Sequence, residues 1–320
     1  MSNPALRLGT RGSKLALAQS THVADALRDK GHTVELVIIK TLGDISSAPI
    51  TELGGVGVFT SALREALIAG DIDLAVHSYK DLPTAAHPKL VLAATPERED
   101  PRDALVARDG HTLASLPAGA LVGTGAPRRL AQIAARRPDL KTLPIRGNVD
   151  SRIQRVLDGE LDAVVLAYAG LRRLGLEQHV TEILNTDVML PAPAQGALAI
   201  ETRPEHAELI AVLDHAPTRA QVNAERALLS TLEAGCSAPV AGYAEICDVF
   251  GEAHLHLYAG VFAADGHNAI RRTYTSPPEQ ATALGTRTAT ALLAANANAL
   301  MRATHQTMPP ASEHHEGEDK

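Results

Sequence analysis

The sequence is almost without aromatic residues. Phe, Trp and Tyr make up 2% of its 320 residues, and tryptophan is absent. Proteins that bind single-stranded nucleic acid commonly stack bases on aromatic rings, so this composition argues against that mode of action. The net charge of −7 argues against a general polyanion binder as well. We therefore expect no nucleic-acid partner, and a hydrophobic core built from Ala, Leu, Val and Ile.

Long apolar stretches are also absent. No window approaches the roughly 18 apolar residues that span a bilayer, and the first eight residues contain no long apolar stretch. We therefore expect a cytoplasmic protein with no membrane partner. The two cysteines, Cys236 and Cys247, are expected to be free in a reducing compartment, with a structural role for Cys247. No pair of Cys or His has zinc-site spacing, and His254 and His256 are predicted to share an exposed strand face, so we predict no metal.

Lysine is scarce among the cationic residues, with 7 Lys against 23 Arg. Arginine is the planar, bidentate partner of carboxylate and phosphate groups. Between positions 128 and 173 the chain has nine Arg and one Lys against five Asp or Glu, an excess of five positive charges. A solvated basic face would explain this count. It would not explain why the arginines recur at strand ends and helix starts, which favours an anionic ligand.

Strands and helices alternate along the first two thirds of the chain, and this alternation predicts parallel α/β lobes. The apolar runs predict strands at 6–8, 34–39, 74–76, 121–123, 141–144, 163–166 and 196–201. Helical patterns predict a helix capped by Ser13 and reaching about Lys30, and further helices at 60–69, 127–136, 149–157 and 205–213.

The pattern changes from Thr218 onward. It predicts a helix at 218–234, strands near 239–246, 254–262 and 269–274, and a long helix at 278–302. If residues 196–213 return to the first lobe, the chain crosses between lobes twice and forms a hinged pair with the ligand between them. The predicted fold is two α/β lobes plus a smaller α+β C-terminal domain. The predicted limits are 1–98 with 196–215, 99–195 and 216–305, followed by a disordered tail at 306–320.

Two charged residues follow the predicted strand 74–76, in the motif HSYKDLP. Residues beyond the carboxyl end of a strand face the ligand crevice of an open α/β sheet, which makes Lys80 and Asp81 candidate site residues. For Lys80, anion binding is favoured over a Schiff base. Asp81 would protonate a leaving group or stabilise developing positive charge, although an aspartate before Leu-Pro can also simply form a turn.

Arginines stand at several predicted helix starts. Arg11 precedes the helix capped by Ser13, where backbone donors already favour an anion. Arg128 and Arg129 lie in the first turn of helix 127–136, where cations oppose the helix dipole, and this cost indicates an anionic ligand that offsets it. The same placement near strand ends and helix starts recurs at Arg146, Arg152 and Arg173.

A lone cysteine stands in the small-residue stretch LEAGCSAPVAGY. Cys236 falls between a predicted helix that ends near Gly235 and a predicted strand that begins after Pro239. A thiol with little side-chain bulk around it suits a reactive or modified cysteine. The alternative is a small hydrophobic residue at a tight turn.

Seven motifs lie in order along the chain: TRGSKLALAQ from Thr10, HSYKDLP from His77, GTGAPRR from Gly123, IRGNVDSR from Ile145, AGLRRLGL from Ala169, PAPAQGA from Pro191 and AGCSAPVAGYAE from Ala234. Through them the chain resembles the porphobilinogen deaminase (hydroxymethylbilane synthase) family over Leu6 to about Leu300. The resemblance implies a deaminating transferase of tetrapyrrole (haem and porphyrin) biosynthesis, with two lobes of the periplasmic-binding-protein type and a third domain. Such an enzyme joins four porphobilinogen molecules and passes the linear product to the next enzyme of the pathway.

The same resemblance implies roles for individual residues. Cys236 would hold a dipyrromethane cofactor by a thioether, and Asp81 would be catalytic. The implied cofactor-binding residues are Ser13, Lys80, Thr124, Arg128, Arg129 and Arg146. The implied substrate-binding residues are Arg11, Arg152, Arg173 and Gln195. The family likeness also suits a monomer.

The chain departs from the family pattern in two motifs. GGVGVF has Val56 where a lysine is common, in the Gly-rich stretch 43–57 that we interpret as a flexible connection or lid. GTGAPRR has Gly125 and Ala126 in place of two hydroxyl side chains. Two other functions fit parts of the sequence. A non-catalytic binding protein with two hinged lobes would explain the arginines without Cys236, and a cysteine hydrolase would need a histidine base, which the sequence does not identify.

Overall fold

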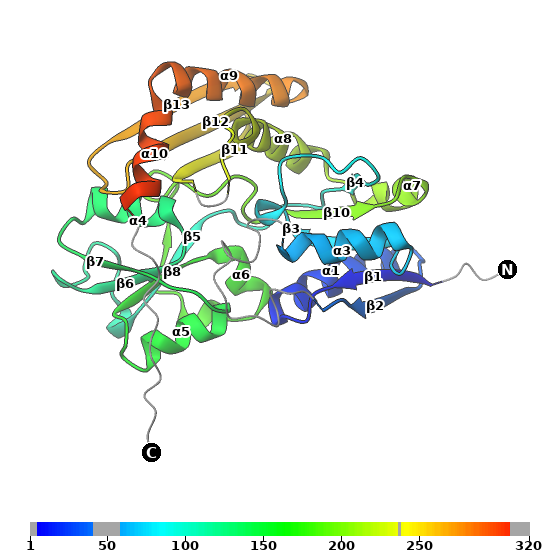
Figure 1. Ribbon diagram of the computed structural model, residues 1–320, viewed down its shortest axis with the longest axis horizontal. Helices are drawn as coiled ribbons and strands as arrows, with labels where there is room; N and C mark the ends of the chain where they lie inside the picture. The colour runs from blue at the N-terminus through cyan, green and yellow to red at the C-terminus, as the bar shows by residue number, and fades with distance from the viewer. Residues whose placement is uncertain (1–4, 41–57, 236–237, 308–320) are drawn as a thin grey trace.

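The structure is a computed structural model that describes residues 5–40, 58–235 and 238–307. Three β-sheets organise these residues (Figure 1). Two five-stranded sheets form the first and second lobes, at the right and lower left of the figure. A three-stranded sheet forms the C-terminal domain above them. The predicted fold class, two α/β lobes plus a smaller α+β domain, is confirmed.

Lobe 1 is a mixed sheet with the strand order β2-β1-β3-β10-β4. Its first three strands are parallel, whereas β10 is antiparallel to both β3 and β4. Helix α1 packs on one face through Val23 and Leu27, and α3 packs on the other through Leu63 and Leu67. The elements are β1 (Leu6–Thr10), α1 (Lys14–Asp29), β2 (Val34–Ile38), α3 (Val58–Ala69), β3 (Leu74–Ser78), β4 (Val91–Ala94), β10 (Leu198–Thr202) and α7 (Ala207–Ile210).

Lobe 2 repeats this arrangement, with the strand order β7-β6-β8-β5-β9. Its fourth strand, β5, is again antiparallel to its neighbours. Ile133 of α4 packs into the core on one face, and Ile153 and Val156 of α5 pack into the core on the other. The elements are β5 (Asp103–Ala107), β6 (Leu121–Thr124), α4 (Pro127–Arg136), β7 (Lys141–Pro144), α5 (Val149–Leu157), β8 (Ala163–Ala167), α6 (Tyr168–Arg173) and β9 (Glu182–Leu184).

The chain crosses between the lobes twice. The first crossing runs from β4 to β5, and the second runs from β9 to β10. Each crossing delivers an antiparallel strand to the sheet that it enters, so both sheets are mixed, and the prediction of a parallel sheet for the second lobe is wrong in this respect. Strands β4, β5 and β9 were not predicted. They have five residues or fewer, and β5 opens on the charged residue Asp103, which leaves an apolar run of only four residues.

The C-terminal domain is an antiparallel meander, β11-β12-β13, covered on one face by α8 and α9. Gly285 lets the two helices approach closely, because a Cβ there would lie 2.2 Å from the carbonyl oxygen of Ala224. The elements are α8 (Ala216–Thr231), β11 (Val240–Val249), β12 (Glu252–Phe262), β13 (Ala269–Ser276), α9 (Ala281–Ala294) and α10 (Ala297–Thr307).

Two predicted helices are divided. The predicted helix 278–302 breaks at Asn296, whose φ of 68° ends α9, so α10 starts in a new direction. The predicted helix 205–213 consists of α7 flanked by the short 3₁₀ turns η5 (Pro204–His206) and η6 (Ala211–Leu213). Helix α10 extends two residues into the predicted tail, whose remainder lies outside the described residues. None of the described helices is both long and apolar enough to cross a membrane.

Candidate functional site

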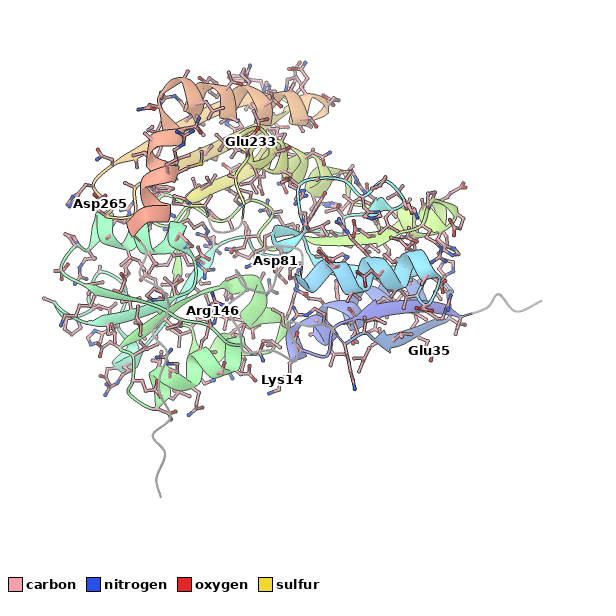
Figure 2. All side chains as sticks on the ribbon, viewed as in Figure 1. Lys14, Glu35, Asp81, Arg146, Glu233 and Asp265 are labelled. Atoms are coloured by element: carbon pink, nitrogen blue, oxygen red, sulfur yellow. The ribbon has the colours of Figure 1, made fainter. Side chains whose placement is uncertain are left out.

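Asp81 lies on a short turn at the carboxyl end of β3. The 3₁₀ turn η2 (Tyr79–Asp81) follows the strand directly, and the amide of Leu82 donates to the carbonyl of Tyr79 at 3.2 Å. Tyr79 and Leu82 are buried, so they anchor the turn and leave Asp81 exposed between them. Figure 2 places Asp81 where the two lobes and the C-terminal domain meet. Asp81 therefore lies just beyond the carboxyl end of a strand, the position on which its prediction as a site residue is based.

Lys80 points from the same turn toward lobe 2. Its ammonium group lies 3.5 Å from the side-chain oxygen of Gln195, in the second crossing. Burial lowers the pKa of Lys80, and the nearby cations Arg128 and Arg129 lower it further, whereas Asp81 opposes the shift. The structure thus brings three predicted regions together: the end of β3, the start of α4 and the second crossing.

Asp103, which was not predicted, is the centre of this cluster. Its carboxylate is fully buried at the start of β5 and accepts hydrogen bonds from Arg128 and Arg129, the two arginines in the first turn of α4. The shortest distances are 2.7 Å to Arg128 Nη1 and 2.7 Å to Arg129 Nη2. The sequence offers one signal for such a role, because an aspartate that opens a buried strand requires a partner.

Gln195 extends the network around Asp103. Its amide nitrogen donates to Asp103 at 2.8 Å and to the carbonyl of Pro101 at 2.7 Å. Its side-chain oxygen accepts from Arg128 at 3.2 Å and faces Lys80. Gln195 is 1% exposed, so it acts as a buried link between the lobes.

The charge balance around Asp103 changes one interpretation. Burial alone would raise the pKa of Asp103, but the charges and hydrogen bonds of Arg128 and Arg129 outweigh burial and hold that pKa well below its usual range. A carboxylate of the protein therefore already compensates the cations at the start of α4. The anionic ligand predicted from these arginines is therefore not the sole source of compensation, since Asp103 supplies one negative charge itself. The pair still has one more positive charge than Asp103 balances.

Two buried side-chain atoms of lobe 2 have no hydrogen-bond partner among the described residues. Thr124 Oγ1, at the end of β6, and Arg152 Nε, in α5, make no hydrogen bond within the described part of the chain. Burial lowers the pKa of Arg152 to about 10, and the nearby Arg129 contributes. A Cβ added to Gly125 would lie 3.7 Å from Arg152 Nη1, so the end of β6 borders this guanidinium. Buried polar groups normally have partners, and an anion placed here would supply them.

Three other candidates lie just beyond strand ends, after β7 and after β1. Arg146 is exposed just beyond β7, on the lobe 2 side in Figure 2. Arg11 is partly buried after β1, and Ser13 caps α1 by accepting a 3.3 Å hydrogen bond from the amide of Ala16. The cap predicted for Ser13 is confirmed, and it occupies one lone pair of the hydroxyl.

Arg173 lies in a different place from the Asp103 cluster. Its guanidinium donates to the carbonyl of Gly196 at 2.6 Å, and burial lowers its pKa to about 10. It lines a pocket of about 490 Å³ beside the first crossing, together with His22 of α1 and Arg98. The structure therefore places this predicted substrate residue at the hinge between the lobes.

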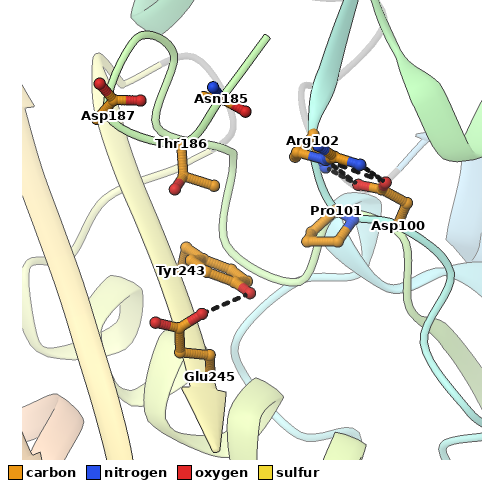
Figure 3. A pocket seen from close by; sticks show the side chains of 8 residues that line it. All are labelled: Asp100, Pro101, Arg102, Asn185, Thr186, Asp187, Tyr243 and Glu245. Carbon is orange, nitrogen blue, oxygen red and sulfur yellow. Dashed lines mark hydrogen bonds and ion pairs between the residues drawn. The ribbon is translucent and has the colours of Figure 1, made fainter. Parts of the chain in front are cut away.

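A second pocket, of about 570 Å³, separates lobe 2 from the C-terminal domain (Figure 3). In its lining, the hydroxyl of Tyr243 donates a hydrogen bond to the carboxylate of Glu245 at 3.2 Å. The guanidinium of Arg102 forms an ion pair with the carboxylate of Asp100 at 2.6 Å. None of the predicted site residues lines it.

His254 and His256 share one face of β12 and are partly buried, whereas exposure was predicted. Within the described ranges, no group of His, Cys, Asp or Glu could hold a metal ion.

Two predictions fall outside the described residues. Cys236 is one of them, and the described chain ends at Gly235 and resumes at Ala238 on either side of it. The Gly-rich stretch with Val56 is the other. Cys247 is a free, partly buried thiol on β11, and burial together with Glu245 raises its pKa, which disfavours the nucleophilic thiolate.

Comparison with known proteins assigns the family. Residues 6–211 match the family model described as porphobilinogen deaminase, dipyromethane cofactor binding domain, and residues 220–294 match porphobilinogen deaminase, C-terminal domain. The chain belongs to the porphobilinogen deaminase family. It is 55% identical to the porphobilinogen deaminase of Nocardia farcinica, over 96% of this chain and 90% of the relative. It is 54% identical to that of Mycobacterium tuberculosis, over 92% and 98%.

Among solved structures, the chain is similar to the periplasmic aliphatic sulphonate binding protein SsuA from Escherichia coli. Sequence identity is 16% and the TM-score is 0.40, over 100% of this chain and 96% of that one. A periplasmic substrate-binding protein of an ABC transporter from Coxiella burnetii is 14% identical, with a TM-score of 0.41, over 65% and 91%.

Within the porphobilinogen deaminase motif at the start of α4, Ala126 gives a stability prediction. Ala126 is the N-cap residue, has extended backbone angles and makes no side-chain cap. Ala126→Ser is expected to raise the free energy of unfolding by about 0.5–2 kcal/mol, because a hydroxyl can accept from a backbone amide in the first turn of the helix. Urea denaturation measures the change. The control Ala135→Ser, in the exposed part of the same helix, should give no gain, and equal gains in both variants would rule out capping as the cause.

Proposed function

We propose that this protein is a porphobilinogen deaminase. It condenses four porphobilinogen molecules, with loss of ammonia, into the linear tetrapyrrole hydroxymethylbilane on a covalently attached dipyrromethane primer. The observation that carries this proposal is the pair of unpartnered, buried donors, Thr124 Oγ1 and Arg152 Nε, beside the cationic start of α4. They lie within the stretch that matches the family's cofactor-binding domain.

The donor set suits a ligand that carries several carboxylates. Each pyrrole unit of the primer or substrate has an acetate and a propionate, and arginine is the preferred bidentate partner of such groups. Each charge-assisted hydrogen bond contributes about 1.5–3 kcal/mol, so several of them hold a flexible chain in register. When bound, the dipyrromethane supplies a nucleophilic pyrrole carbon for chain growth. Its anchor is Cys236, and the binding residues are Ser13, Lys80, Thr124, Arg128, Arg129 and Arg146.

The incoming porphobilinogen requires its own contacts. Arg11, Arg152 and Arg173 bind its carboxylates, and Gln195 keeps the surrounding cations in position through Asp103. Loss of ammonia from the aminomethyl group leaves a cationic, azafulvene-like centre. The exposed carboxylate of Asp81 stabilises that cation and the pyrrole N–H through charge and hydrogen bonding.

The cellular setting follows from the chemistry of the cysteine. A thioether can form at Cys236 only if its thiol stays reduced, and cytoplasm maintains that state. We therefore place the protein in the cytoplasm. It acts as a monomer, because each chain contains every residue assigned above. Its linear product passes to the next enzyme of the tetrapyrrole pathway.

Intact mass spectrometry tests the proposal. The purified parent should carry the extra mass of two linked pyrrole units, and Cys236→Ala should lack both this mass and the consumption of porphobilinogen. Cys247→Ala is the matched control and should keep both. If the parent is isolated without the added mass, incubation with porphobilinogen should restore it. A parent that gains no mass and consumes no porphobilinogen would refute the function.

A further inference from the structure

Arg226 makes an unusual set of contacts across a domain boundary. It belongs to α8 of the C-terminal domain, but its guanidinium reaches the Asp81 turn of lobe 1. Nη1 donates to the carbonyl of Leu82 at 2.9 Å and to that of Tyr79 at 3.3 Å, and Nη2 donates to the carbonyl of Pro83 at 2.6 Å. The guanidinium also lies over the Tyr79 ring, 4.5 Å from its centroid.

These acceptors bracket the catalytic residue. Tyr79 precedes Asp81 by two residues, and Leu82 and Pro83 follow it directly, so the fork of Arg226 holds the backbone on both sides of the carboxylate. The turn is also restrained by the packing of Tyr79 and Leu82 in a buried apolar cluster and by two backbone hydrogen bonds. The amide of Tyr79 donates to the carbonyl of Ala197 at 3.0 Å, and the amide of Leu82 donates to the carbonyl of Tyr79 at 3.2 Å. A planar guanidinium with several donors is suited to gather carbonyls that point in different directions.

Helix α8 is itself held in place against the two crossings between the lobes. Glu225, the neighbour of Arg226, is fully buried and accepts from Arg98 of the first crossing at 2.6 Å. Glu225 also accepts from the amides of Ala194 and Ala244, at 2.5 Å and 2.7 Å. A buried, fully paired carboxylate of this kind fixes the helix against both crossings. The same helix ends at Thr231, five residues before Cys236.

We propose that Arg226 is a positioning residue for the reaction. It acts through three backbone carbonyls and the Tyr79 ring, and holds the Asp81 carboxylate at a set position relative to the helix that leads to the anchoring cysteine. This inference rests on the proposed function, in which Asp81 meets the cationic centre of a chain that grows from Cys236. Arg226 itself touches neither substrate nor cofactor.

Two measurements on Arg226→Met test the proposal. Hydrogen exchange of the Tyr79 and Leu82 amides should become at least 10-fold faster, because the turn loses its clamp. In steady-state kinetics kcat should fall about 10- to 100-fold while KM for porphobilinogen stays within about threefold, since misplacement of a catalytic group by 1 Å is costly. Arg226→Lys keeps the charge and some of the hydrogen bonds, and should recover part of both losses.

Arg219→Met is the matched control. Arg219 lies seven residues earlier, on the same face of α8, and also reaches lobe 1, donating to the carbonyl of Ala93 at 3.2 Å. It pairs with Asp214 at 2.6 Å, and its charge acts on Tyr79, but among the described residues its hydrogen bonds go to Asp214 and Ala93 and not to the backbone of the Asp81 turn. This variant should leave the exchange of Tyr79 and Leu82, and kcat, within about threefold of the parent.

The outcomes separate the inference from the function on which it rests. If the parent converts porphobilinogen but Arg226→Met matches Arg219→Met in exchange or in kcat, Arg226 does not position Asp81. Faster exchange at the turn with an unchanged kcat would equally overturn the proposal. A parent that does not convert porphobilinogen would instead refute the function, while the exchange data would still report whether Arg226 holds the turn.

Discussion

Asp103→Asn is expected to lower the free energy of unfolding by about 3–5 kcal/mol. The substitution keeps the size of the side chain but removes its charge, and so leaves Arg128 and Arg129 buried with no carboxylate between them. Breaking a buried ion pair from one side is far more costly than its net contribution, because an uncompensated charge stays behind. Urea denaturation of the two proteins measures the difference.

The pH dependence of this difference has a definite sign. The pKa of Asp103 in the folded protein lies well below its unfolded value, so its stabilisation is fully present above about pH 4–5 and declines as pH falls toward the folded pKa. The gap between parent and Asp103→Asn should therefore be widest near neutral pH and should narrow below about pH 4. A gap that stays constant from pH 7 to pH 3 would show that packing, not charge, is responsible.

Asp100→Asn provides the matched control for Asp103. Asp100 also pairs with an arginine, Arg102, at 2.6 Å, but Asp100 and Arg102 have side-chain exposures of 18% and 36%. Solvent screens such a pair, so the loss should be about 0–1 kcal/mol. Equal losses in the two variants would contradict the special role of the buried site.

Much of the fold could be predicted because its signals are local. Pro127 at a first turn and Arg136 at a last turn bound α4, and the sequence predicts α5 and β7 with equal accuracy. The failures have non-local causes. β5 and β10 run antiparallel because they enter their sheets from the other lobe, and no local pattern encodes that direction. The break at Asn296 also had no glycine or proline to mark it.

The candidate site divides in the same way. Lys80 and Asp81 could be predicted because a strand end and its ligand crevice are linked by topology. Asp103 could not be predicted as the partner of Arg128, because the two lie 25 residues apart and meet only when β5 packs beside α4. Arg226 is separated from its acceptors by an even longer stretch of sequence, and lies 144 positions after Leu82. Its position in an ordinary amphipathic helix gave no sign of a contact with another domain.

Asp81→Asn is expected to lower kcat for porphobilinogen consumption by about 10²–10⁴-fold, the contribution typical of a well-placed acid–base group. Because Asp81 is exposed, its replacement should change the free energy of unfolding by no more than about 0.5 kcal/mol. Steady-state kinetics and urea denaturation measure the two effects. Asp71→Asn, at an exposed aspartate near the opposite end of β3, is the control and should change neither.

Asp81→Asn and Arg226→Met should have different effects on hydrogen exchange at the turn and on turnover. Asp81→Asn removes the charge but keeps the clamp, so hydrogen exchange at Leu82 should stay at the parent rate while turnover collapses. Arg226→Met keeps the carboxylate but loosens its backbone, so exchange should rise and turnover should fall less. If Asp81→Asn retained the parent kcat, the cationic centre would have to be stabilised by another group, and a clamp on this turn would then serve the fold alone.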